Sequence, residues 1–332
     1  MRYGGNQLMG TLNDNCVKEI GDKSMKVLIS TSSFGKADSR PLKLCEAKMD
    51  VAMNPYGRKL TTEEFIDLTA DVDAVIAGVE EITREALEKR PNIKVISRCG
   101  VGMDSVDQEA CRELGVRLYN TPNAPVDSVA ELTVTILLDL LKNVSNMNTA
   151  VKSGSWNKMT GFLLKGKKAG IIGCGRIGSR VAQLLTAFGA ETAYTDIRDL
   201  ENGYAFMDKS ALIKWADIIT IHTSGCEEGE YIIGRQELLE MKEGAFLVNT
   251  SRGKFVDEDA LYEALKTGRM QGAALDVYGQ EPYKGRLCEL ENVILTPHIS
   301  SSAKEGRAVM ETEAVHNLLE GLGICHDKSD CI

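Results

Sequence analysis

Three residues in the last third of the chain carry side chains that together can move a proton and hold an anion. Arg252, Glu281 and His298 each follow a short apolar segment of the kind that forms a buried strand. An imidazole can take and return a proton near neutral pH, and a neighbouring carboxylate favours its charged form. A guanidinium can hold a carboxylate through two parallel hydrogen bonds, which a lysine cannot do. These residue types predict acid–base chemistry on a small acid.

Each of these residues alone has an ordinary explanation, because isolated arginines, glutamates and histidines commonly form surface ion pairs or are solvated. The other histidines are placed differently. His222 also ends an apolar segment, whereas His316 falls on an expected helix and His326 lies in the tail. Of the four, His298 has the best position for catalysis.

The elements that would position these residues are six apolar segments in the second half of the chain. They cover residues 169–172, 191–195, 217–221, 245–249, 272–275 and 292–295, and they end beside Gly173, Asp196, His222, Thr250, Asp276 and His298. In an open parallel α/β sheet, ligands bind beyond the carboxyl ends of the strands, so the loops that leave these ends collect functional groups. The pattern predicts a cofactor site.

The first of these segments runs into a glycine-rich loop and then into a helix. Gly173, Gly175 and Gly178 form a GxGxxG pattern, and apolar residues recur at helical spacing after it. The pattern alone is a weak signal, but here strand, loop, helix and a later acidic residue occur in order. The first glycine permits a tight turn, the second lets the backbone approach a pyrophosphate, and the third allows the helix to pack closely. A dinucleotide site is therefore expected.

The acidic residue at the end of the next segment indicates which dinucleotide binds. Asp196 can accept hydrogen bonds from the adenosine ribose and would repel a 2′-phosphate, which favours NAD over NADP. Arg198 lies two residues on and could meet a 2′-phosphate, but a solvated loop arginine is the more ordinary explanation. NAD is the expected cofactor.

The first half of the chain repeats the alternation of strands and helices. Strands are expected at residues 26–30, 51–54, 74–78, 94–98 and 116–119, with helices between them such as 61–70, where Thr61 and Glu64 have capping-box spacing. An apolar helix is expected at 127–141, after a turn cluster. Residues 149–168 suit a polar arm at a subunit contact. A helix at 303–322 can pack back on the first half. The fold class is α/β, with two Rossmann-like or flavodoxin-like doubly wound parallel-sheet domains and a cleft between them.

Composition excludes several kinds of partner. The chain has 332 residues and a formal charge of −9, so no basic surface for nucleic acid is expected. Its nine cysteines show no CxxC spacing, which predicts neither a disulfide framework nor a metal site and fits a cytoplasmic protein. No secretory signal is recognisable, and the most apolar stretch, 126–141, contains acidic residues and is too short to span a membrane.

Taken together, the motifs resemble those of the NAD-dependent D-isomer-specific 2-hydroxyacid dehydrogenases, and among these the phosphoglycerate dehydrogenase-like members. The similarity covers about residues 25–322. It rests on the segments 97–104, 120–122, 130–132, 173–178, 249–253, 276–282 and 296–298. The resemblance implies that His298 is the acid/base, that Glu281 is its partner and that Arg252 anchors the carboxylate and carbonyl of the substrate.

The same resemblance implies further contacts. The backbone of Gly100, Val101 and Gly102 would bind the substrate carboxylate, although a simple strand-to-helix turn would also explain the glycines, and Arg98 is open between a substrate contact and a structural pairing. The implied cofactor contacts are Val101, Gly173, Gly175, Arg176, Ile177, Gly178, Asp196, Thr223, Thr250, Ser251 and Asp276. The implied domains are 25–122 with 299–332 for the substrate and 123–298 for NAD, after an extension at 1–24. A homodimer is usual.

Two departures from the family pattern bear on the substrate. Relatives specialised for 3-phosphoglycerate often place an Arg-Ser pair after the third strand, where this chain has Val79 and Glu80, and the loop after His222 is acidic. Phosphoglycerate is therefore one candidate beside hydroxypyruvate, glyoxylate and other 2-oxo acids. A non-catalytic NAD(H) sensor or corepressor-like scaffold is the alternative function. Formate oxidation is disfavoured because formate enzymes carry Gln at the position of Glu281.

Overall fold

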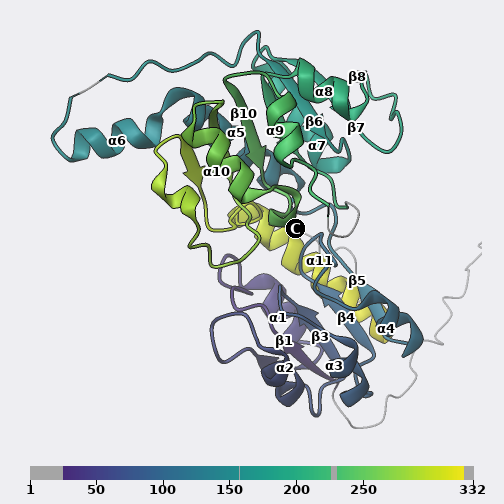
Figure 1. Ribbon diagram of the computed structural model, residues 1–332. Helices are drawn as coiled ribbons and strands as arrows, with labels where there is room; N and C mark the ends of the chain where they lie inside the picture. Colours follow the sequence, from purple (N-terminus) through teal and green to yellow (C-terminus); the bar gives the residue numbers. More distant parts are fainter. Residues whose placement is uncertain (1–24, 157, 226–229, 325–332) are drawn as a thin grey trace, which may run out of the picture.

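The computed structural model describes residues 25–156, 158–225 and 230–324. The expected extension at 1–24 and the tail after residue 324 lie outside these residues. Figure 1 shows two lobes, one above the other, and each is built on a parallel sheet with helices packed on it. The predicted α/β class with two parallel-sheet domains is confirmed.

The first lobe holds a five-stranded sheet in the order β2-β1-β3-β4-β5. Val27 and Ile29 of β1 pack in the core on one face of this sheet and Leu28 in the core on the other, as the alternation of side chains along a strand requires. The predicted capping box of Thr61 and Glu64 is present at the start of α2. The elements are β1 (Lys26–Ile29), α1 (Arg40–Glu46), β2 (Asp50–Met53), α2 (Thr62–Leu68), β3 (Ala74–Ala77), α3 (Arg84–Lys89), β4 (Val95–Arg98), α4 (Gln108–Glu113) and β5 (Arg117–Tyr119).

The second lobe holds a seven-stranded sheet in the order β12-β11-β10-β9-β6-β7-β8. All six predicted strands are present, and the short edge strand β8 was not predicted because its two residues are exposed and show no apolar pattern. The elements are β6 (Lys168–Ile172), α7 (Arg176–Ala187), β7 (Glu191–Thr195), β8 (Ala205–Phe206), α8 (Lys209–Trp215), β9 (Ile218–Ile221), α9 (Arg235–Glu240), β10 (Ala245–Asn249), α10 (Glu258–Lys266), β11 (Met270–Leu275) and β12 (Val293–Leu295), with 3₁₀ turns at Gly253–Phe255 and Arg286–Glu289.

Two long helices follow the points at which the chain passes between the lobes. Helix α5 (Val126–Lys142) comes after β5 and packs against α7 and the strands β10, β11 and β12 of the second lobe. Helix α11 (Lys304–Leu322), yellow in Figure 1, returns to the first lobe and packs on β3, β4 and α1. Its buried Met310, Val315 and Leu318 belong to the same core as Val27 and Ile29. The prediction that the last helix packs back on the first half is confirmed.

The segment after α5 projects away from the rest of the second lobe (Figure 1). The arm predicted from residue 149 begins within α6 (Val144–Lys152), which is helical through Lys152. No residue of α6 is buried, so this helix has no face packed in the core. Exposed apolar side chains continue along the arm, including Trp156 with 80% of its surface exposed and Leu163 with 68%.

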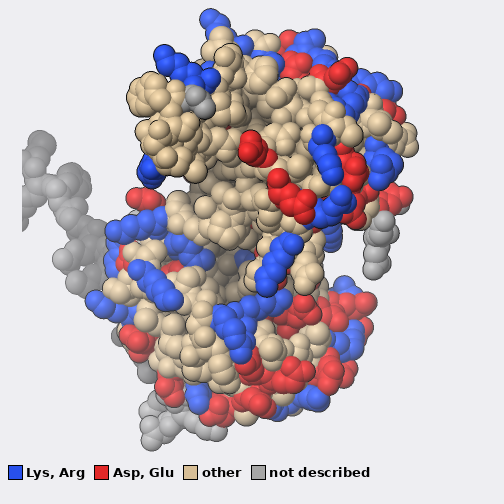
Figure 2. Space-filling model, turned by 60° about the vertical axis from the view of Figure 1, so that its left-hand side comes forward, with Lys and Arg blue, Asp and Glu red and all other residues tan. Residues whose placement is uncertain are grey.

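A constriction separates the two lobes, and Figure 2 shows it on one face of the molecule. The strand order reverses between β6 and β9 in the second sheet and between β1 and β3 in the first. Ligand sites of open α/β sheets lie outside the strand ends at such reversals. Within the described ranges, no helix combines the length and the apolar character that crossing a bilayer would need.

Candidate active site

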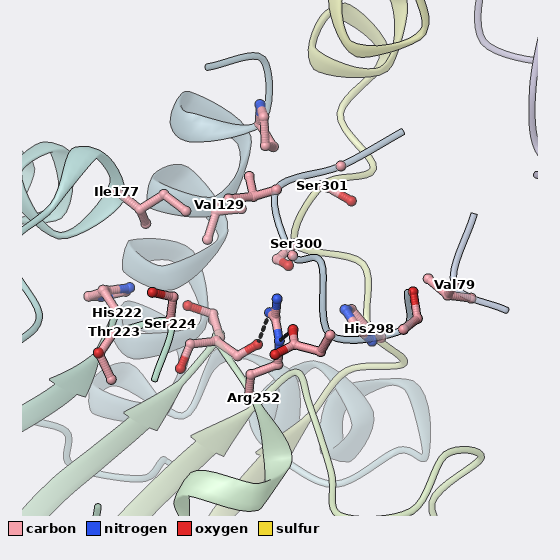
Figure 3. A pocket seen from close by; sticks show the side chains of 18 of the residues that line it. Val79, Val129, Ile177, His222, Thr223, Ser224, Arg252, His298, Ser300 and Ser301 are labelled. Atoms are coloured by element: carbon pink, nitrogen blue, oxygen red, sulfur yellow. Dashed lines mark hydrogen bonds and ion pairs between the residues drawn. The ribbon is translucent and has the colours of Figure 1, made fainter. Parts of the chain in front are cut away.

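A cavity of 290 Å³ lies between the lobes, and residues of both lobes line it. Of the residues predicted from the sequence, it brings together Arg98, Gly100, Val101, Gly102, Ile177, Thr223, Thr250, Ser251, Arg252 and His298. Each lies at or beyond the carboxyl end of a strand or in the first turn of the helix after it. In Figure 3, Arg252 lies between His298 on one side and His222, Thr223 and Ser224 on the other. The predicted guanidinium and imidazole therefore face the same cavity.

His298 and Glu281 form a direct pair beside this cavity. His298 Nδ1 lies 2.8 Å from Glu281 Oε2, and the backbone N–H of Tyr278 donates to Glu281 Oε1 at 3.2 Å. Burial alone would raise the pKa of Glu281, but the hydrogen bond and the charge of His298 outweigh it and lower this pKa. The carboxylate thus stays ionised and orients the ring, and the other ring nitrogen, Nε2, remains for a substrate oxygen.

Asp276 holds the loop that carries His298. This carboxylate is fully buried and accepts hydrogen bonds from Thr296 Oγ1 at 2.6 Å and from the backbone N–H groups of Ile299 and Ser300 at 2.8 Å. His298 itself has a left-handed backbone with φ of 53°, which is uncommon for a residue other than glycine. The structure therefore shows Asp276 bracing the histidine loop, and its contact with the nicotinamide stays a prediction.

Arg252 is fixed in orientation by its neighbours. Its Nε donates to Asp104 Oδ2 at 2.8 Å, and its Nη1 donates to the backbone carbonyl of Ser251 at 2.7 Å. The buried Asn249 shapes the turn, because its side chain donates to the carbonyl of Arg252 and accepts from the backbone N–H of Ser251. Sequence reasoning assigned no role to Asp104 or Asn249. The pairing of Asp104 with Arg252 joins residues far apart in the chain, so no local signal marked it.

The glycine loop has the shape that the sequence predicted. Gly173 has a φ of 87°, and a Cβ on Gly173 would meet the backbone of Thr223 in the next loop. A Cβ on Gly178 would overlap the carbonyl of Gly173, so the start of α7 packs directly on the loop. A Cβ on Gly175 would meet nothing within 4 Å, which leaves the backbone there open to a ligand. The N-terminus of α7 begins with Arg176, and the arrangement fits a bound pyrophosphate.

Asp196 lies against the same loop. Its Oδ2 accepts the backbone N–H of Cys174 at 2.8 Å, and its Oδ1 accepts the N–H of Ile197 at 2.8 Å. The carboxylate is therefore held where the adenosine ribose of a dinucleotide bound on the loop would lie, while Arg198 is exposed. Neither residue lines the cavity, and their contacts with the cofactor stay predictions.

His222 was noted in the sequence but not selected as a site residue. Its side chain is half-buried and lines the cavity, with Nε2 lying 2.8 Å from Thr220 Oγ1. Its Nδ1 is buried without a hydrogen-bond partner in the part of the chain that the structure describes. Burial lowers the pKa of His222 to about 3, so the ring is neutral. A buried polar atom without a partner beside the glycine loop fits a site that a bound dinucleotide completes.

Arg98 reaches the cavity from the first lobe. Its Nη1 donates to the carbonyl of Cys99 at 2.6 Å, and its Nε is buried without a hydrogen-bond partner among the described residues. Burial lowers the pKa of Arg98, and the charge of Arg252 lowers it further. The guanidinium covers Gly100, where a Cβ would collide with it. The structural pairing that the sequence left open is thus a bond to a backbone carbonyl, and the substrate contact stays a prediction.

A dinucleotide loop in one lobe, facing an acid–base pair and a guanidinium at a cleft, defines a class of protein, the two-lobed dehydrogenases of 2-hydroxy acids. Comparison with known proteins gives the family. The model for the NAD binding domain of the D-isomer specific 2-hydroxyacid dehydrogenases matches residues 134–300. The chain belongs to this family. The prediction of an NAD-dependent oxidoreductase that acts on 2-hydroxy or 2-oxo acids is confirmed.

Individual relatives agree on the family and differ in substrate. A hydroxypyruvate reductase of Thermotoga maritima is 34% identical over 80% of this chain and 90% of its own length. A D-3-phosphoglycerate dehydrogenase of Methanocaldococcus jannaschii is 38% identical over 79% of this chain, and the matched part covers 52% of that enzyme. The crystal structure of the TT0316 protein from Thermus thermophilus superposes with a TM-score of 0.84 at 34% identity, covering 90% of this chain and 97% of that one.

Proposed function

We propose that the protein reduces a short, unphosphorylated 2-oxo acid such as hydroxypyruvate or glyoxylate with NADH, and oxidises the corresponding D-2-hydroxy acid in reverse. The observation that carries this proposal is the convergence of Arg252 and the His298–Glu281 pair on one cavity. Lys and Arg side chains also gather beside the constriction on the face in Figure 2, which favours the approach of an acid.

The proposed mechanism uses each of these groups at a stated atom. Arg252 holds the carboxylate and the carbonyl oxygen of the acid through its guanidinium edge. His298 gives a proton from Nε2 to that carbonyl oxygen during reduction and takes it back during oxidation. Glu281 stabilises the protonated ring through Nδ1. Bound NADH supplies the hydride to C2 of the acid.

The first-lobe wall of the cavity supports a substrate without phosphate. Val79, which is 52% exposed, stands in this wall where the phosphoglycerate-type pattern would place a phosphate-binding pair. Glu80 turns away from the cavity and is buried against Ser30 and the backbone N–H of Gly78. The relative named for hydroxypyruvate reduction also matches over nearly its whole length, whereas the phosphoglycerate enzyme matches over half.

The proposal extends to the cofactor contacts and to the domain limits. Residues 123–298 would form the NAD domain, and 25–122 with 299–332 the substrate domain, of which 325–332 are outside the described residues. The packing of α11 on β3 and β4 supports these limits. The predicted cofactor contacts around Gly175, Asp196 and Thr223 gain support from the open backbone at Gly175 and the placement of Asp196 on the loop.

We also propose a homodimer in the cytoplasm. The projecting arm carries exposed apolar side chains at Val144, Val151, Trp156 and Leu163, which a second copy would cover. Phe162 anchors the arm by packing its ring against Phe246 in the second lobe. The cysteines within the described ranges are free thiols, which fits a reducing compartment. Light scattering on the purified protein gives the oligomeric state, and a monomer at micromolar concentration would contradict the dimer.

The test of the function is a substrate screen. The purified protein is mixed with NADH or NADPH and with glyoxylate, hydroxypyruvate, pyruvate or 3-phosphohydroxypyruvate, and absorbance at the nicotinamide band is followed. We expect the highest kcat/KM with NADH and an unphosphorylated acid. A preference for the phosphorylated acid would contradict the substrate assignment. Tight NADH binding without turnover of any acid would instead favour the scaffold alternative.

A further inference from the structure

Asp104 is a carboxylate in the cavity wall that the proposed mechanism does not use. It lies on the first-lobe loop that follows Gly102, and its side chain is 46% exposed. Its Oδ2 pairs with Nε of Arg252, which belongs to the second lobe, at 2.8 Å. The ion pair therefore crosses the cleft at the point where the substrate carboxylate is expected.

The pair fixes which edge of the guanidinium is available. Nε is bonded to Asp104, and one N–H of Nη1 is bonded to the carbonyl of Ser251. Among the described residues no further bond to this guanidinium is found, so Nη2 and the second N–H of Nη1 remain as a parallel pair, which is the geometry that matches a carboxylate. A Cβ on Gly102 would overlap Nη2, so this edge lies directly against the loop that contains Gly102.

The charges around Asp104 support a positioning role. Arg98 and Arg252 are two cations on one cavity, and the charge of Arg252 disfavours that of Arg98. Burial alone would raise the pKa of Asp104, but the hydrogen bond and charge of Arg252 outweigh it and lower this pKa. Asp104 therefore carries its negative charge at neutral pH, where it offsets the repulsion between the two guanidinium groups.

We propose that Asp104 is a positioning residue, which holds Arg252 across the cleft with its Nη edge turned toward the substrate carboxylate. Opening of the lobes would break the ion pair, so the guanidinium would take this orientation only when the lobes are closed. This inference rests on the proposed function in one respect, namely that Arg252 binds a carboxylate.

The competing explanation is that Asp104 occupies the place of the substrate carboxylate and must be displaced by it. Such a placeholder would take the Nη edge, whereas Asp104 takes Nε and leaves that edge open. The two explanations predict opposite changes in substrate affinity when the carboxylate is removed.

The experiment compares D104A and D104N with a matched control, D107N. Asp107 lies on the same loop, caps α4 by accepting the N–H of Ala110, and has no hydrogen bond to Arg252. Asn caps a helix as well as Asp does, so D107N should behave as the parent. Thermal unfolding of all variants shows whether the fold is kept. The affinity for NADH, measured by fluorescence, should stay within about twofold because the pair lies outside the glycine loop.

The readout is the affinity for a 2-oxo acid. We expect D104A to raise KM by about 10- to 100-fold, with a smaller change in kcat, because a misoriented guanidinium binds the acid poorly. D104N should recover part of the loss, since its amide oxygen can still accept the N–H of Arg252 Nε. An unchanged KM in D104A would overturn the proposal, and a lower KM would establish the placeholder instead.

A second measurement does not require turnover. Oxamate, a non-reacting analogue that carries the same carboxylate, is titrated calorimetrically into each protein saturated with NADH. Weaker binding to D104A than to D107N supports the positioning role even if no acid in the screen is reduced. A failure of the positioning role can thus be distinguished from a failure of the proposed function. Equal or tighter binding to D104A overturns it. Absence of oxamate binding to the parent would show that Arg252 holds no carboxylate, and the positioning role would fail with it.

Discussion

The two lobes present very different surfaces to the cavity they share. The second lobe offers side chains that are braced by several hydrogen bonds, as His298 is by Glu281 and the loop around it by Asp276. The first lobe offers backbone at Gly100 and Gly102, the apolar Val79, and an arginine with an unpaired buried nitrogen. Braced groups keep the geometry that proton transfer needs.

This difference separates two tasks. In the proposed mechanism the second lobe determines the reaction, because its groups would meet the parts that every 2-hydroxy acid has in common. We expect the first-lobe wall at Val79 and Arg98 to determine the choice of acid, because it would face the remainder of the substrate. Substitutions of the proton-transfer pair in the second lobe should therefore change kcat for all acids, and substitutions in the first-lobe wall at Val79 and Arg98 should change the ranking of acids.

The largest effect is expected at His298. His298→Asn should lower kcat by about 10²- to 10⁴-fold for every acid, because the group that exchanges the proton is lost. NADH binding, followed by fluorescence, should stay as in the parent. A variant that keeps full turnover would remove His298 from the mechanism and would break the assignment of the reaction to the second lobe.

Substitution of His222 tests, through the free energy of unfolding, whether the second lobe holds this ring neutral. Burial holds its pKa at about 3 in the folded protein, whereas an ordinary histidine has a value near 6.5. The unfolded chain therefore binds a proton below pH 6.5 that the folded chain refuses, and stability falls as the pH drops toward 3. From pH 7 to pH 5 the loss is about 2 kcal/mol.

His222→Gln should remove this contribution and keep a bond to Thr220. Urea unfolding at pH 7 and pH 5 gives the free energy of unfolding of both proteins. The difference between the two pH values should be smaller in the variant by about 2 kcal/mol. Identical pH dependence in parent and variant would show that the ring is not held neutral.

Glu281→Gln should shift the pH profile of reduction. The pKa of Glu281 is lowered in the folded protein, so the carboxylate keeps its charge down to acid pH and supports the protonated ring of His298. Without that charge the protonated ring is less favoured, so reduction should fail at a lower pH than in the parent. The matched control is E258Q, because Glu258 bonds the same loop at Gly279. A profile that moves equally in both variants would argue against a specific role for Glu281.

The smallest effect is expected at Arg98 in the first lobe. Arg98→Met keeps an unbranched apolar stem, although a shorter one, and removes the charge, so KM should change by a few-fold to about tenfold with kcat nearly constant. The ranking of glyoxylate, hydroxypyruvate and pyruvate should change as well. R117M serves as the control, because Arg117 begins the neighbouring strand β5, at the opposite end of the strands from Arg98. An equal fall in kcat for all acids would contradict the division of tasks between the lobes.

Local patterns in the sequence predicted much of the fold. The apolar segments became strands, the capping box formed at Thr61, and the glycine loop has the positive φ at Gly173 that its pattern required. These features depend on residues close together in the chain. The edge strand β8 and helix α6 escaped prediction because neither has a buried face of its own.

The candidate site was predictable in its residue types but not in its support. Arg252 and His298 were found because each follows a strand end, and parallel strands bring such ends to one edge. The partnership of Asp104 with Arg252 depends on how the two lobes close, and the bracing by Asp276 depends on a loop that comes more than twenty residues later. No periodicity or local motif encodes either distance.

Helix α11 has a consequence for how the polypeptide is completed during synthesis. The strands of the second sheet emerge as one uninterrupted block, so that half can assemble while the ribosome is still at work. The first sheet, although it emerges earlier, lacks the cover that Met310, Val315 and Leu318 supply until the last helix has left the ribosome. The half that is translated first is thus the half that is finished last.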